Sequence, residues 1–557
     1  MKQKLVLLQF ALMLAVPVSI SAQDPFLSSL EKEMNREFSE LKKQEIPAYY
    51  ICYRVAEQTL IDISGSFGAL DRLQQSSSRQ LTTQVRVGSP ELDNFHQVRE
   101  TNSYTPNVRT PLPMSNDDAV IAQILWQTTN ENYFQAIQKF TQIKGSLAVN
   151  VAQEDKTPDF SVETPVQYFE PALKVTLDKP TEEKLISKVR LYSKAFTASK
   201  NISSCSVRFS INYDRDYFVS SEGSKIAENH PQINLFITGY TLADDGMEMS
   251  LYKSYFATDL KDLPKDETVI ADVNSLVKKL EALRVAPVVE PYSGPALLSG
   301  AATGVFFHEI FGHRIEASRM KSENDAQTFK KKVGQQVLNK NLSVIFDPTL
   351  TTYKGFILNG AYKYDDEGVK SRKVTIVTKG ILTDFLSSRT PIDGFLKSNG
   401  HGRAQSGLNP VSRQSNLFVE SDQILSEQDL RKLFVDELKK QNLEFGFYFK
   451  EVSGGFTQTG RIQPNAFNVT PLEVYKVYAD GKPDELVRGI NLVGTPLAMF
   501  SEIEAVGGDY GVFNGTCGAE SGGVAVASVC PMMFVKKIEI QKKQKSGNTK
   551  PILDRPY

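Results

Sequence analysis

The residues most able to do chemistry lie in one short run, Phe306 to His313, which reads FFHEIFGH. His308 and His313 are two of only five histidines in 557 residues, and Glu309 directly follows the first. Neutral imidazoles are good ligands for Zn²⁺, which in catalytic sites takes three protein ligands and a water. A carboxylate beside such a ligand can be the general base that takes a proton from that water. The run therefore predicts a zinc hydrolase centre of the kind that peptidases use, with Glu309 as the catalytic residue.

The spacing of the two histidines requires a departure from a regular helix. Residues five apart lie about 140° apart around an α-helix of 3.6 residues per turn. A π-type turn brings such residues back toward one face, and Gly312 is the residue best able to permit a local distortion. We therefore expect a π-bulge or a helix break over residues 311–313. The alternative is a pair of buried core histidines with Glu309 as their polar partner.

Three residues are candidates for the third metal ligand. Glu316 lies one turn beyond His313, His401 lies in the run SNGHGR, and Cys517 lies in the glycine-rich run GTCGAESGG. A thiolate in such a turn can approach a metal without crowding. The alternative for Cys517 is a buried thiol or half of a disulfide bond. Spacing alone leaves all three candidates open.

The chain has four cysteines, at positions 52, 205, 517 and 530, which are too few for a disulfide scaffold of this length. Pairing of Cys52 with Cys205, or of Cys517 with Cys530, is conceivable in an oxidising compartment. Cys530 lies inside an apolar run and is expected to be an ordinary core residue. The fold must therefore be stabilised by its hydrophobic cores.

Five blocks in the second half of the chain resemble, in the same order, those of the TldD/PmbA family of metallopeptidases. They are 304–317 (GVFFHEIFGHRIEA), 362–386 with its run DDEG, 400–416 (GHGRAQSGLNPVSRQSN), 454–509, and 515–526 (GTCGAESGGVAV). The resemblance implies that zinc is bound by His308, His313 and Cys517, with Glu309 catalytic. It also implies paired subunits around an enclosed cavity in which extended or unfolded peptides are hydrolysed. Ala404 departs from the family pattern, which commonly has a second arginine there.

Four further residues are candidates for substrate binding. An extended peptide can pair with an exposed strand edge, and Gly454 and Gly455 would let the two backbones approach closely. Arg403 and Arg413 are candidates to bind a substrate carboxylate bidentately. The alternative is that each arginine only orders a loop.

Together these observations predict a zinc-dependent peptidase that acts on extended or unfolded peptides, as a homodimer or as a heterodimer with a related chain. The alternative is a noncatalytic peptide-binding or scaffold subunit whose metal only stabilises the fold. Glu309 favours the enzyme, because a purely structural site needs no base beside its ligand.

The first 22 residues have the pattern of a secretory signal peptide. Two lysines precede the apolar run Leu5 to Val18, which ends in small residues and is shorter than the ~20 residues of a membrane span. We expect a secreted protein, periplasmic if the source is a Gram-negative bacterium, with no stable membrane insertion. An N-terminal membrane anchor is the alternative. The formal net charge of −1 provides no field to recruit nucleic acid.

The elements that must position these residues predict an α+β fold in two domains. An N-terminal α+β domain is expected over 23–285, followed over 286–557 by a mostly antiparallel β-sheet or barrel-like domain that carries the HExxxH helix. A run rich in Pro, Gly and small residues, 286–304, marks the boundary. Helical periodicity predicts helices at 25–43, 117–126, 132–140, 181–191, after residue 272 and at 426–441. Alternation and apolar runs predict strands at 49–55, 60–64, 81–87, 205–213, 217–221, 355–362, 374–385 and 524–540.

Overall fold

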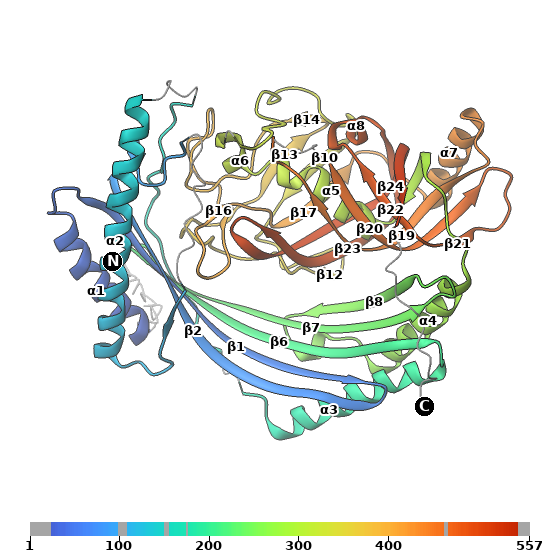
Figure 1. The fold of residues 1–557 in the computed structure, drawn as a ribbon, viewed down its shortest axis with the longest axis horizontal. Coiled ribbons are helices and arrows are strands. Elements are labelled where there is room, and N and C mark those ends of the chain that lie inside the picture. The colour runs from blue at the N-terminus through green and yellow to red at the C-terminus, as the bar shows by residue number, and fades with distance from the viewer. Residues whose placement is uncertain are drawn as a thin grey trace, which may run out of the picture.

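The computed structural model describes residues 24–98, 109–149, 155–173, 176–322, 324–461 and 466–543, and it contains two large β-sheets. Figure 1 shows the long strands of the first sheet curving beneath the second half of the chain. The predicted signal peptide, residues 1–22, lies outside the described residues. Among the described residues, no helix is both long and apolar enough to cross a membrane.

The first sheet has eight strands in the order β3-β2-β1-β6-β7-β5, with β4 paired to β2 and β8 to β7. Its strands are β1 (Ala48–Ser66), β2 (Ala69–Ser89), β3 (Leu92–Asp93), β4 (Thr110–Leu112), β5 (Gln167–Phe169), β6 (Ile202–Ser220), β7 (Lys225–Leu242) and β8 (Glu248–Ala257). Phe67 and Gly68, with φ of 47° and 91°, form the two-residue turn between β1 and β2. Positive φ at both positions suits a turn that follows the twist of the strands.

Four helices cover this sheet: α1 (Pro25–Leu41), α2 (Asp118–Val149), α3 (Lys179–Lys194) and α4 (Asp266–Val285). In α1 and α3, an Asp caps the first turn and a Pro follows at its start, which is the usual chemistry of a helix N-terminus. The helices α3 and α4 pack on one face through a core that includes Val189, Phe209 and Leu280. The helix α3 lies on the far side of the sheet from the second half of the chain (Figure 1), whereas α4 also contacts that half, because Lys279 donates to Glu473 at 2.6 Å. The other face of the sheet is turned toward the second half.

The second half forms a twelve-stranded sheet in the order β14-β13-β10-β17-β24-β22-β20-β19-β9. Its main strands are β9 (Tyr292–Leu298), β10 (Leu342–Phe346), β13 (Val374–Thr378), β14 (Ile381–Leu382), β17 (Asn416–Ser421), β18 (Ile424–Leu425), β19 (Phe445–Thr457), β20 (Phe467–Tyr478), β21 (Glu485–Val487), β22 (Ile490–Gly494), β23 (Ile503–Ala519) and β24 (Gly522–Lys542). Because β9 pairs with both β19 and β24, five of these strands close into a ring. The sheet is thus barrel-like in part, as expected.

Smaller elements complete the second half. They are α5 (Gly300–Ile310), α6 (Ala317–Lys321), α7 (Glu427–Lys440), α8 (Pro496–Ser501), and the two-residue strands β11 (Thr352–Tyr353), β12 (Phe356–Ile357), β15 (Gly402–Arg403) and β16 (Val411–Ser412). The helix α5 packs against β19, β20, β23 and β24. Its Phe306 meets Phe467 edge-on with ring centroids 5.6 Å apart, which places α5 in the main core.

The α+β fold is confirmed, but several predicted elements are wrong in extent. The strands predicted at 49–55 and 60–64 are one strand, β1, and those predicted at 205–213 and 217–221 are one strand, β6. The helices predicted at 117–126 and 132–140 are one helix, α2. In the strand predicted at 355–362, only Phe356–Ile357 is strand. The boundary predicted at 285 falls between α4 and β9, and all four cysteines are free and buried.

Candidate metal centre

The helix α5 carries the first two functional residues into the core. Ser299 caps the helix, because its hydroxyl accepts a hydrogen bond from the backbone N–H of Ala302 at 3.2 Å. A Cβ on Gly300 would lie 2.1 Å from the backbone nitrogen of Gly511, so only glycine lets the helix start this close to β23. His308 and Glu309 lie in the last turn and are both buried.

The helix ends between the two histidines, as the spacing predicts. Phe311 leaves the helical conformation with φ −120° and ψ −53°, and residues Gly312–Arg314 form a 3₁₀ turn. The distortion is therefore a break followed by a tighter turn, and the π-bulge is not formed. Gly312 is required for space: an added Cβ would lie 1.9 Å from Oε1 of Gln414. The imidazole rings of His308 and His313 end up with centroids 5.0 Å apart.

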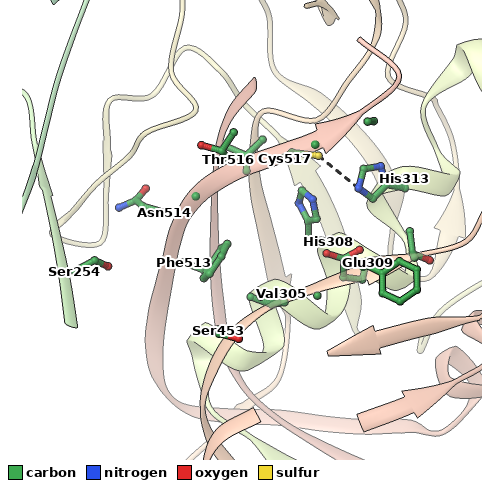
Figure 2. Close-up of a pocket in the computed structure, with 18 of the residues that line it drawn as sticks. Ser254, Val305, His308, Glu309, His313, Ser453, Phe513, Asn514, Thr516 and Cys517 are labelled. Carbon is green, nitrogen blue, oxygen red and sulfur yellow. Dashed lines mark hydrogen bonds between the residues drawn. The ribbon is translucent and has the colours of Figure 1, made fainter. Parts of the chain in front are cut away.

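Cys517 reaches these histidines from β23. Its Sγ lies 3.4 Å from Nε2 of His313, and one ligand atom from each of His308, His313 and Cys517 falls within 4.8 Å of the others. Figure 2 shows the two imidazoles and the sulfur turned toward one another, with Glu309 beside them. All four side chains are buried.

The electrostatics of this cluster favour ionisation of its thiol, and the thiolate is the form that binds a metal. Burial by itself would raise the pKa of the Cys517 thiol, but His308 and His313 lower it well below its ordinary value. Burial would lower the pKa of His313, but Cys517 and Glu316 raise it to about 10. Thiolate sulfur and imidazole nitrogen are both ligands of Zn²⁺, and catalytic zinc sites use three protein ligands. The residues present therefore fit a zinc ion.

Glu316 is placed beside the cluster and supports one of its members. One carboxylate oxygen, Oε2, lies 3.2 Å from Nδ1 of His313 and 2.8 Å from Nε of Arg319. Burial would raise the pKa of Glu316, but His313 and Arg319 lower it to about 2. An ionised carboxylate at Nδ1 keeps the proton on that nitrogen and leaves Nε2 free for a metal. Glu316 thus orients a ligand candidate and is not itself brought to the other two.

His401 does not belong to the cluster of ligand candidates. Its ring is fully buried, with Nδ1 at 3.0 Å from Oδ1 of Asn399 and Nε2 at 3.0 Å from Oγ of Ser415. Of the three candidates for the third ligand, the structure brings only Cys517 into the cluster with the two histidines.

Glu309 lies next to His308, and both line a cavity between the two sheets. Burial raises its pKa, and His308 and His313 partly offset that rise. Gly455 on β19 packs against this side chain: an added Cβ would lie 2.7 Å from Cγ of Glu309 and 2.7 Å from the backbone oxygen of Asn468. Glycine at 455 therefore allows the strand to run directly past the carboxylate.

We expect Gly455→Ala to lower the stability of the protein. The added methyl must displace Glu309 or the backbone of β20, and overpacking of this kind destabilises by about 1–3 kcal/mol. The check is thermal unfolding of the purified variants. Gly145→Ala in α2 is the control, because no atom lies within 4 Å of its added Cβ. Equal behaviour of the two variants would contradict the packing described here.

The cluster opens on a cavity of about 1060 Å³ between the two sheets. The first sheet supplies polar and aromatic side chains from its uncovered face, including Asn234, Phe236, Tyr252 and Ser254. The hydroxyl of Tyr252 donates to the backbone oxygen of Val452 at 3.1 Å and so ties the sheet to β19. The sequence did not lead us to predict that the first sheet forms a wall of this cavity. Polar residues do alternate along β7, but the same alternation is expected on a face turned to solvent.

The structure places the four predicted substrate-binding residues in two different settings. Gly454, with φ of 144°, and Gly455 line the cavity. Arg403 is buried, and its Nη1 donates to the backbone oxygens of Gln414 at 2.7 Å and Ala525 at 2.8 Å. It lines a separate cavity of about 690 Å³.

Arg413 is also buried and donates to backbone and hydroxyl groups of the β23–β24 hairpin, and it does not line the first cavity. These contacts are those of loop-ordering arginines. Contact of either arginine with substrate stays a prediction.

Comparisons with known proteins agree with this site. Residues 291–542 match the family described as the PmbA/TldA metallopeptidase C-terminal domain, a span that contains both histidines, Glu309 and Cys517. A metalloprotease of Methanothermobacter thermautotrophicus is 28% identical over 324 residues, which is 57% of this chain and 65% of that protein. A zinc metalloprotease TldD homolog of Saccharolobus solfataricus is 24% identical over 421 residues, 74% of this chain and 88% of that protein.

Solved structures with the same fold extend over nearly the whole chain. TldE from Thermococcus kodakarensis superimposes with a TM-score of 0.61 at 14% identity and covers 93% of this chain and 100% of its own. A putative modulator of a DNA gyrase from Thermotoga maritima gives a TM-score of 0.57 at 17% identity and covers 92% of this chain and 99% of its own. At these identities the likeness shows the fold alone. Residues 291–542 are thus similar to the PmbA/TldA metallopeptidase C-terminal domain, and the relatives that resemble this chain at 24–28% identity are named metalloproteases.

Proposed function

We propose that this chain is a zinc-dependent peptidase that hydrolyses extended or unfolded peptides. The observation that carries the proposal is the convergence of His308, His313 and Cys517 in one buried cluster, with Glu309 beside it on a cavity. The names of the relatives, which are metalloproteases, support the same class of reaction.

The roles of the side chains follow from their positions. When bound, zinc supplies a Lewis acid that polarises the scissile carbonyl and lowers the pKa of a water. The carboxylate of Glu309 takes a proton from the attacking water and then gives it to the leaving amine. Its carboxylate lies beside the three ligand candidates and lines the cavity, which places it for both transfers.

The shape of the site favours an extended substrate. Beyond Phe449, β19 pairs only with β20 among the described strands, so the backbone of residues 454–457 has no strand partner on its other side. These residues line the cavity, and an added peptide strand would find unpaired backbone groups there. A cavity of about 1060 Å³ is of the size that encloses a ligand or a short peptide segment, and it is too small for a folded domain.

The alternative function, a noncatalytic subunit with a structural metal, is less well supported. Structural zinc sites are closed by four protein ligands, whereas three protein ligands leave one position for water or substrate. The cluster offers three ligands and opens on the cavity. A buried carboxylate beside such an open position has a role in hydrolysis and none in a closed structural site.

The compartment and the partner are further parts of the proposal. The N-terminal run of residues 1–22 supports export, into the periplasm if the source is a Gram-negative bacterium. Assembly with a second chain of the same fold, either a second copy or a related subunit, is proposed from the resemblance of the motif blocks alone.

Metal removal tests the proposed function. We expect the purified chain to cleave an unstructured peptide, and a zinc chelator to lower kcat by more than ~10²-fold, because several kcal/mol of Lewis-acid stabilisation are lost. Added Zn²⁺ should restore the rate. The same peptide sequence held inside a folded domain is the control and should resist cleavage. Peptide hydrolysis that continues at the parental rate after complete metal removal would contradict the proposed function.

A further inference from the structure

The third ligand candidate must be held in place from outside the histidine segment. Cys517 lies near the tip of the hairpin formed by β23 and β24, where it pairs with Val524 and the last pair is Ala519 with Gly522. It is 204 residues from His313 in sequence, yet its Sγ lies 3.4 Å from Nε2 of that residue. Among the described strands, none outside the hairpin pairs with this tip, so hydrogen bonds from other segments fix the approach, including one from the backbone N–H of Gln405 to the backbone oxygen of Ser521 at 2.9 Å.

Arg413 forms hydrogen bonds with both strands of this hairpin tip. Its Nη2 donates to the backbone oxygen of Cys517 at 2.6 Å. Its Nη1 donates to Oγ of Ser521 at 2.6 Å and to the backbone oxygen of Gly522 at 2.9 Å. The guanidinium is 0% exposed, so these bonds are not weakened by competition with water.

The same guanidinium faces the group that orients His313. Nε of Arg413 lies 3.6 Å from Oε1 of Glu316, and neither atom has a hydrogen-bond partner within the described residues. The other oxygen of Glu316 lies 3.2 Å from Nδ1 of His313. One buried arginine is therefore linked to the sulfur ligand through a backbone bond and to an imidazole ligand through a carboxylate.

We propose that Arg413 is a positioning residue that assembles the metal centre before a metal binds, by fixing the Cys517 hairpin and, through Glu316, the ring of His313. The inference rests on the metal centre of the proposed function, and the substrate contact predicted for this residue stays a prediction. A lysine cannot substitute, because an ammonium is a single point charge and cannot reach Cys517, Ser521 and Glu316 from one planar fork.

The test is the metal affinity of Arg413→Lys in the full chain. We expect chelator competition to show Zn²⁺ binding weakened by ~10–100-fold, the usual effect of losing a group that orients a ligand. With Co²⁺ as the probe, we expect the thiolate-to-cobalt absorption band to weaken or shift, because Cys517 no longer meets the metal in the same geometry. A purely structural role would lower the unfolding temperature without changing that band.

Arg389→Lys is the matched control. Arg389 is 2% exposed, and its guanidinium binds the backbone oxygen of Ser161 at 2.6 Å and Glu222 at 2.7 Å, away from the first cavity. This variant should lose stability while it keeps the parental zinc affinity and cobalt spectrum. Loss of zinc affinity in both variants to the same extent would overturn the specific role of Arg413.

A second variant covers the case in which Arg413→Lys does not fold. Ser521→Ala removes one acceptor of Arg413 and leaves its charge paired, so we expect a smaller loss of zinc affinity in the same direction. Parental zinc affinity in both variants, with a clear loss in Cys517→Ala, would overturn this inference alone. Absence of a thiolate-to-cobalt band in the parental chain with Co²⁺ bound would overturn Cys517 as a ligand, and this inference with it.

Discussion

Glu309→Gln is expected to lower kcat for peptide hydrolysis by about 10²–10⁴-fold, the usual contribution of a positioned general base, while the zinc content stays parental. An amide has the same shape as the carboxylate but cannot take the proton of the attacking water. Because burial raises the pKa of Glu309, a neutral side chain is also well tolerated at this place, and the unfolding temperature should not fall.

Glu367→Gln is the matched control for this substitution. Glu367 is buried like Glu309, burial likewise raises its pKa, and it does not line the first cavity. The control should keep the parental kcat. The measurements are kcat with an unstructured peptide and zinc content by elemental analysis. Parental kcat in Glu309→Gln would remove the proposed mechanism, whereas loss of zinc in that variant would show that Glu309 supports the site instead of acting in the reaction.

The local part of the site could be predicted from the sequence, and the distant part could not. His308, Glu309 and His313 lie within six residues, so their chemistry follows from residue type and spacing, and even the helix break follows from geometry. Cys517 comes from a hairpin far along the chain, and sequence spacing does not favour it over Glu316 or His401 as the third ligand. Only the resemblance to a family, and then the fold, distinguishes a ligand from a carboxylate that orients one.

The errors in the predicted boundaries of the strands β1 and β6 have a common physical origin. The predicted breaks in β1 and β6 fall on polar residues, such as Asp214 and Asp216, that sequence patterns treat as turns. In the structure these side chains line a cavity between the two sheets, so the strand continues with polar residues on a face that is neither core nor open surface. A sequence pattern that distinguishes only core-facing from solvent-facing residues does not predict a strand whose polar side chains line a cavity.

The helix break shows the same limit at the level of one residue. Gly312 is predicted to matter for its backbone freedom, but its φ is not in the left-handed region, and it matters because Gln414 occupies the space of a side chain. Gln414 comes from a segment about 100 residues later, so no local rule could reveal the contact. Tertiary packing, and not helix propensity, thus sets the angle between the two histidines.

Cys517→Ala is expected to weaken zinc binding by more than the ~10–100-fold that loss of an orienting group causes, because it removes one of the three proposed ligands. Peptide hydrolysis should fall with the zinc content and should recover only partly at high Zn²⁺. The fold should survive, because this side chain belongs to a small cluster with Val524 and Val526 outside the main core. Zinc stoichiometry and thermal unfolding of the metal-free chain are the measurements.

Cys530→Ala separates the role of a ligand from that of a buried thiol. Cys530 lies in the main core, and burial raises the pKa of its thiol, the reverse of the direction at Cys517. Its removal should lower stability by the amount that a small core cavity costs and leave zinc affinity unchanged. If Cys517→Ala instead keeps a full equivalent of zinc with parental affinity, the two histidines bind the metal with some other ligand, and Arg413 holds the hairpin for a reason unrelated to the metal.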